Sequence, residues 1–222
     1  MHIYRKYNLK TDPRITKDID TLIIAAGTDQ RAYESIRILN DRGIKIKDVL
    51  VFDFEERRQN LNSKKQINKY EEYERLKVKY TPFKSKLYDV YGAREQIKEG
   101  MNVALDISCF TKPYFFVLFQ NIIEKIKQEV VSIYYTEPTS YRFERGRFEK
   151  YAYSVGSLEI KPMPGFPGRR EKSYKKLLIV LLGFDGRVSQ YLVEDQEIKE
   201  KIIINGFPSY AHKFKEISLI NN

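Results

Sequence analysis

The chain of 222 residues is long enough for one large domain, or for one domain with a smaller appendage, and its 42% hydrophobic content indicates a folded core. Its 40 Lys and Arg residues against 30 Asp and Glu give a net charge of +10, which attracts polyanions or simply marks a solvated basic surface. The single cysteine, Cys109, excludes an internal disulfide, and two histidines leave little material for a zinc site or a Ser-His-Asp triad.

The first 137 residues alternate short apolar runs with helical patterns. Such alternation is typical of βαβ units, so we predict an α/β fold with a Rossmann-like, mostly parallel sheet flanked by helices in residues 1–137. The charged stretch 55–77 is expected to be an exposed helix or a helical excursion at the sheet edge. Strands are predicted at 22–26, 46–54, 76–80, 102–108 and 130–136, and helices at 31–43, 88–100 and 112–129.

The clearest helical pattern is residues 112–129. Pro113 suits a first helical turn, and Phe115, Phe119, Ile122 and Ile126 share one predicted face. This helix follows the apolar strand at 102–108, which makes the junction between them a well-defined strand-to-helix turn.

Residues 138–222 have a different texture, rich in Pro, Gly, Arg and Tyr at first. We expect a loop- or hairpin-rich segment, with a hairpin around Gly146 and a loop at 162–170. A short βα extension then follows, with strands in KKLLIVLL and EKIIIN, and it either completes the first sheet or starts a second.

Polar residues recur at the predicted strand ends, where parallel sheets bind ligands. After the first strand come Gly27, Thr28 and Asp29, and Asp53 ends the second. Glu137 follows the strand at 130–136, and Arg187 lies in the late GFDGR loop, where its charge would help to neutralise a phosphate. We predict that these ends converge on one ligand site.

The stretch DISCFTK, at the turn before the helix at 112–129, is the sharpest part of this site. Ser108 and Thr111 lie where the helix begins, so its free N–H groups and the Lys112 ammonium favour an anion such as phosphate. Asp106 ends an apolar strand and needs a hydrogen-bonding reason, either orienting the turn or binding a ligand hydroxyl. Ordinary helix capping by Ser108 or Thr111 is the alternative.

Several familiar sites are missing from the sequence. No G-x-G-x-x-G, Walker A or G-x-S-x-G motif occurs, so we expect no NAD, FAD or other cofactor, and no metal. Cys109 is expected to be a packed thiol rather than a nucleophile.

The N-terminus lacks a signal-peptide core, and no apolar run approaches the ~20 residues that span a bilayer, so we expect a cytoplasmic protein without a membrane partner.

Two stretches, LIIAAGTDQ and ALDISCFTKPYFFVLF, resemble the ligand loops of CARF domains and the related SAVED domains. Ser108, Thr111 and Lys112 match the turn of that family, although Phe110 replaces its glycine. The resemblance implies a Rossmann-like sensor of cyclic oligonucleotides in a prokaryotic antiviral system, with an effector protein as partner and a homodimer as its assembly.

The leading hypothesis is therefore a nucleotide-binding or second-messenger-sensing protein rather than an enzyme. One alternative is a nucleotide- or nucleoside-processing enzyme, a glycosidic-bond hydrolase or transferase, that uses Asp29, Asp106 or Glu137. A second alternative is a protein–protein or nucleic-acid adaptor that uses the charged segment 55–86 and the Tyr- and Arg-rich segment 141–153.

Overall fold

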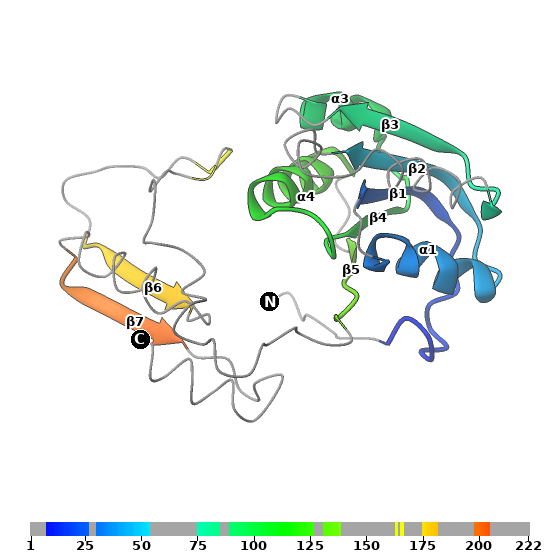
Figure 1. Cartoon of the computed structure of the whole chain (residues 1–222). Coiled ribbons are helices and arrows are strands. Elements are labelled where there is room, and N and C mark those ends of the chain that lie inside the picture. Colours follow the sequence, from blue (N-terminus) through cyan, green and yellow to red (C-terminus); the bar gives the residue numbers. More distant parts are fainter. Residues whose placement is uncertain are drawn as a thin grey trace, which may run out of the picture. The chain divides into compact units, whose positions relative to one another are not determined.

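A computed structural model of the chain describes residues 8–26, 30–53, 75–84, 89–126, 131–138, 163, 165–166, 175–181 and 198–204. The chain divides into two compact units, residues 1–139 and residues 140–222. The first unit contains a five-stranded sheet, and the second contains a two-stranded one (Figure 1).

The five-stranded sheet is parallel throughout, which confirms the predicted α/β, Rossmann-like class. Its strand order is β3-β2-β1-β4-β5, so β1 and β4 lie at the centre as neighbours. The strands are β1 (Ile19–Ala26), β2 (Ile46–Asp53), β3 (Tyr80–Lys84), β4 (Val103–Asp106) and β5 (Ser132–Tyr134).

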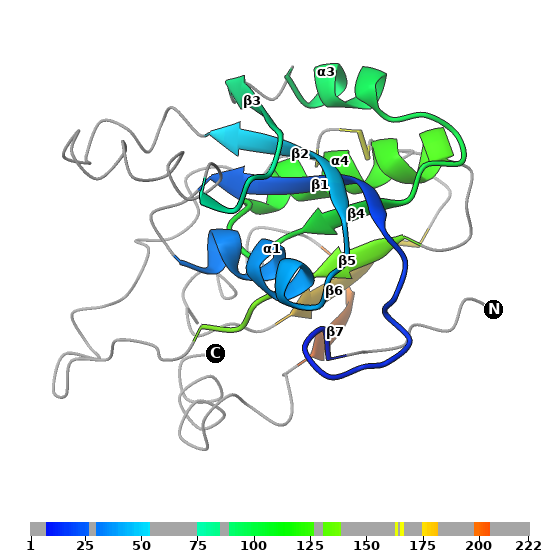
Figure 2. The ribbon, with the colours of Figure 1, turned by 90° about the vertical axis from the view of Figure 1, so that its right-hand side faces the viewer.

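Helices cover both faces of this sheet. Helix α1 (Arg31–Asp41) follows β1 and lies on one face, while α3 (Asp89–Gln96) and α4 (Lys112–Ile126) lie on the other (Figures 1 and 2). The connections from β1 to β2 and from β4 to β5 run in opposite directions across the sheet. Because each such crossover is expected to be right-handed, their helices α1 and α4 lie on opposite faces.

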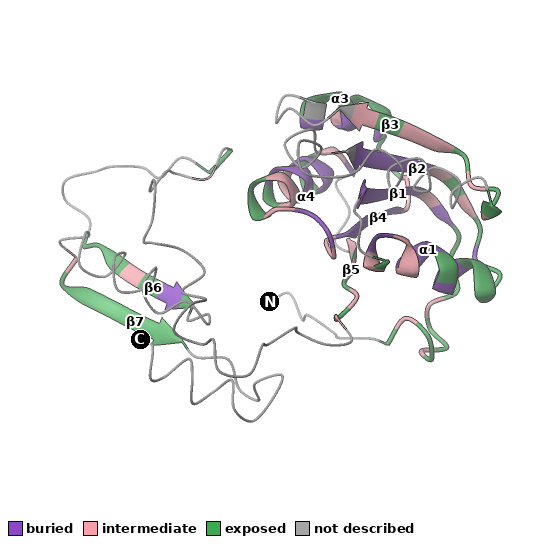
Figure 3. Ribbon diagram, in the orientation of Figure 1, coloured by how far each residue is buried: buried purple, intermediate pink, exposed green. Residues whose placement is uncertain are grey.

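The central strands are buried on both faces, as covered parallel strands should be (Figure 3). In β1, Ile23 and Ala25 pack in the cluster that includes α3 and α4, whereas Leu22 and Ile24 pack in the cluster that includes α1. Alternate residues of a strand point to opposite faces, so the continuous apolar run of β1 supplies two cores at once.

Helix α4 confirms the predicted helix, but its buried stripe is wider than the sequence pattern suggested. Phe115 and Phe119 are only partly buried and pack at the margin of the core, while Val117 and Leu118 are fully enclosed. The reason is that α4 packs against α3 as well as against the sheet. Ile122 and Ile126 are buried as predicted.

The two edge strands differ from their predicted bounds. The predicted bounds 76–80 are wrong, because β3 begins only at Tyr80 and continues to Lys84. In this strand Pro82 lies opposite Val51 of β2. A proline is tolerated there because β3 is an edge strand, whose outer side needs no N–H donor. At the other edge, β5 is limited to three residues, all paired with the short β4.

Ahead of β1, the N-terminal segment from Asn8 is fastened to the end of α1 by one side chain. The guanidinium of Arg42 donates to the carbonyl oxygens of Leu9, Asp12 and Ile15, the last two at 2.6 and 2.9 Å. Leu9 and Ile15 also pack against the α1-side core. A planar group with several fixed donors is well suited to bind three carbonyls at once.

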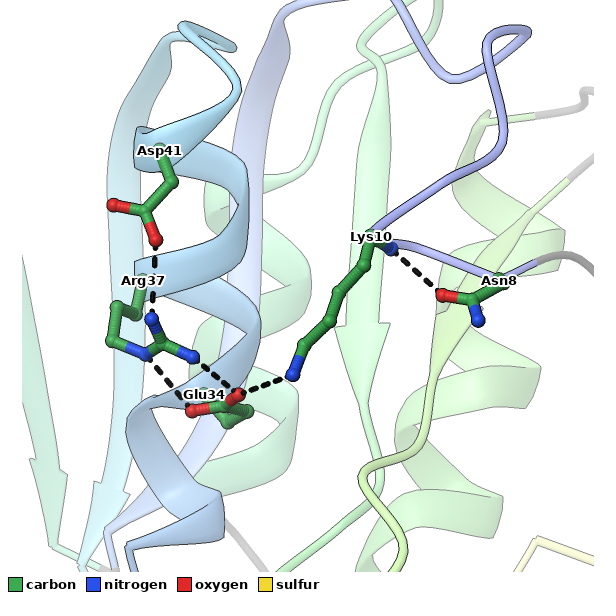
Figure 4. Close-up of polar contacts among 5 residues, drawn as sticks. All are labelled: Asn8, Lys10, Glu34, Arg37 and Asp41. Carbon is green, nitrogen blue, oxygen red and sulfur yellow. Dashed lines mark hydrogen bonds and ion pairs between the residues drawn. The ribbon is translucent and has the colours of Figure 1, made fainter.

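A second set of contacts connects this segment to α1 at the surface (Figure 4). Glu34 accepts two hydrogen bonds from Arg37, at 2.6 and 3.0 Å, and pairs with Lys10 at 3.4 Å. Arg37 also donates to Asp41 at 3.1 Å. These groups are largely solvated, so we expect each pair to contribute little to stability.

In the second unit, β6 (Leu177–Leu181) and β7 (Glu200–Ile204) pair in parallel, with Leu177 opposite Glu200. Both strands were predicted, and they form a sheet of their own rather than strands of the first sheet. The predicted hairpin around Gly146, most of the loop at 162–170 and the helix at the C-terminus lie outside the described residues. Among the residues that are described, no helix has the length and apolarity to cross a membrane.

Candidate functional site

The strand order reverses between β1 and β4, and this defines where a ligand site is expected. The chain passes from β1 outward to β2 and β3, then returns to β4 on the other side of β1 and continues to β5. Helices α1 and α4 leave the carboxyl ends of β1 and β4 toward opposite faces, so their N-termini flank the same point. In open parallel sheets, ligands bind in the crevice at such a reversal.

Asp106 occupies the carboxyl end of β4, below the rim of the sheet. Strand β4 pairs with β1 only as far as Leu105 opposite Ile23, while β1 continues to Ala26. On its other side Asp106 lies opposite Tyr134 of β5. Strand β1 continues past this position, and Asp106 is only 2% exposed.

One oxygen of Asp106 holds the turn that follows β4. Its Oδ1 accepts the backbone N–H of Ser108 at 2.8 Å and also the Ser108 hydroxyl. The same hydroxyl accepts the N–H of Thr136 at 2.8 Å. It therefore links the turn after β4 to the stretch after β5. The orienting role considered for Asp106 is therefore present, and it is Ser108 that the carboxylate orients.

The other oxygen of Asp106, Oδ2, is buried and makes no hydrogen bond within the described part of the chain. The hydroxyl of Ser35, on the buried face of α1 and 1% exposed, is in the same situation. Ser35 lies near enough to lower the pKa of the Asp106 carboxyl, yet the two oxygens do not reach hydrogen-bonding geometry. A buried acceptor without a donor costs about 1–3 kcal/mol.

Burial raises the pKa of Asp106 above its usual value, because the charged form loses its water. Hydrogen bonds from Ser108 and the positive charge of Arg31, at the start of α1, oppose this shift only in part. The pKa of Tyr134 is likewise raised, first by burial and further by the nearby Asp106 charge. The α1 side of the carboxyl edge is thus a poor place for negative charge.

The turn between β4 and α4 is anchored by apolar side chains. Cys109 and Phe110 are buried in the α4-side core, and the Phe110 ring packs 5.7 Å from that of Phe52 on β2. Cys109 is therefore a packed thiol, as predicted. The Phe110 that departs from the glycine of CARF domains has a structural place in this fold.

Helix α4 starts directly after this anchor. The Thr111 carbonyl accepts the N–H groups of Tyr114 and Phe115 at 3.1 and 3.3 Å, which places Thr111 at the cap position. Lys112 begins the helix and is exposed, and no acidic residue occupies the first turn. This end of α4 therefore presents positive potential to solvent.

The predicted site residues are brought together only in part within the described chain. Asp106, Ser108, Thr111 and Lys112 share the β4–α4 junction, and Glu137 is exposed just beyond β5. Direct contact of any of them with a ligand stays a prediction. Four further predicted residues lie outside the described residues: Gly27, Thr28, Asp29 and Arg187.

Sequence reasoning missed two residues beside Asp106. Ser35 stands among the apolar positions of α1 that include Ala32, Ile36 and Leu39, so helical spacing alone would have put it on the buried face. Tyr134 lies two residues from Ser132 in β5, and its side chain packs on the α1 side as Asp106 does. No cluster of three or more potential metal-binding side chains is found in the portion of the chain that the structure describes.

Comparison of the chain with protein-family models finds no matching family, and comparison with curated proteins finds no match either.

Proposed function

We propose that the first unit binds a nucleotide at the carboxyl edge of its sheet, between β1 and β4, and serves as a sensor. The observation that carries this proposal is the buried Asp106 at the reversal of strand order, with one oxygen that no described group satisfies. Buried polar atoms in folded proteins nearly always have partners, so an unsatisfied one at this point of the fold indicates a ligand.

The charge around α4 supports an anionic ligand. Lys112 is exposed at the start of the helix, its first turn lacks acidic residues, and the chain as a whole carries +10. Backbone N–H groups at a helix start bind phosphate readily when a cation is added beside them. A nucleotide offers such a phosphate.

Sensing, rather than turnover, rests on the resemblance of the β1 and β4 loops to CARF and SAVED domains. On that basis the ligand is a nucleotide second messenger, cyclic oligonucleotides included, and the protein is a cytoplasmic component of a prokaryotic antiviral system that acts through an effector. The sheet order and the position of the Ser108–Lys112 turn are compatible with this proposal.

A thermal-shift panel of nucleotides and cyclic oligonucleotides tests the proposal. A ligand at about 100 times its Kd should stabilise the protein by about 2.7 kcal/mol and raise Tm accordingly. Lys112→Ala should weaken binding about tenfold, because it removes the cation at the helix start. The matched control is Lys125→Ala, which removes the same charge from the last turn of α4.

The outcomes separate the alternatives. If no nucleotide raises Tm, the proposal is wrong. Equal losses in Lys112→Ala and Lys125→Ala would indicate non-specific attraction by the basic surface, as expected of a nucleic-acid adaptor. Chromatography of the same incubations detects turnover, and a product that disappears with Asp106→Asn would favour the enzyme, for which the raised pKa of this carboxyl would suit a general acid.

A further inference from the structure

We draw no further inference here: the strongest candidate, the surface patch of exposed apolar side chains on helix α4 and the edge strand β5 (Phe116, Ile123 and Ile133), carries none because nothing in the structure shows what covers it.

Discussion

The two oxygens of Asp106 differ in their hydrogen bonding. Its Oδ1 fixes the turn after β4 through Ser108, and its Oδ2 lies buried beside Ser35 without a hydrogen bond inside the described chain. The residue is 2% exposed, and this burial raises the pKa of its carboxyl.

The raised pKa of Asp106 predicts a pH dependence of stability. The folded protein binds this proton more tightly than the unfolded chain, so the contribution is fully present below the unfolded pKa and is lost as pH rises through the folded value. In urea denaturation from roughly pH 4 to about pH 8, Asp106→Asn should gain stability relative to wild type as pH increases.

A second aspartate provides the control with opposite sign. The pKa of Asp20 is lowered, first by the Lys47 ammonium and then by the backbone N–H of Asn102, so its contribution is lost as pH falls. Asp20→Asn should therefore lose stability relative to wild type as pH rises. If the two variants changed in parallel, the proposed environment of Asp106 would be incorrect.

At this scale the sequence was informative about Asp106 and much less so about its partners. A carboxylate ending an apolar strand stands out in the sequence, and Ser108 is close enough to suggest a local turn. The bond from Thr136 to Ser108 joins residues 28 positions apart, and the approach of Ser35 requires α1 to lie over β4. Such contacts depend on strand order, which local patterns do not specify.

Among the elements, the N-terminal segment depends on Arg42. Its guanidinium binds three carbonyls, so Arg42→Ala should leave them without these donors and cost about 2 kcal/mol of unfolding free energy. Urea denaturation measures the loss, and limited proteolysis should show faster cleavage within residues 8–15. Arg42→Lys should recover only part of the stability, because an ammonium lacks the planar arrangement of donors.

Arg37→Ala is the matched control for Arg42. Arg37 lies within α1, whereas Arg42 is the C-cap of that helix, and the Arg37 partners Glu34 and Asp41 are at the surface (Figure 4). Its removal should cost less than about 1 kcal/mol, as exposed ion pairs usually do. A similar cost for both variants would mean that the carbonyl contacts of Arg42 add nothing.

Elements with continuous burial were predictable, and edge elements were not. The runs that became β1, β2 and β4 are apolar because helices cover both faces of the sheet. For β3, the residues Leu76 and Val78 looked like strand because they are apolar, but they pack against the core from outside the strand. Pro82 lies within the true strand, where an edge position tolerates it.

For the whole molecule, the division after Thr139 predicts that the first unit folds alone. A chain ending at Thr139 contains the complete five-stranded sheet and both of its cores, so it should unfold cooperatively with native circular dichroism. A chain ending at Tyr134 retains the same strands but lacks the Thr136 N–H that binds Ser108, and it should be less stable by about 1 kcal/mol. Failure of the longer chain to fold would show that the units depend on each other.

The bond between Thr136 and Ser108 also has a mechanical consequence. The Ser108 hydroxyl is shared by the turn beneath α4 and by the stretch through which the chain leaves the sheet toward the second unit. A displacement of that hydroxyl by even one ångström breaks contacts on both sides together, because a hydrogen bond tolerates little stretching. The turn between β4 and α4 and the stretch after β5 are thus linked through a single oxygen atom, that of the Ser108 hydroxyl.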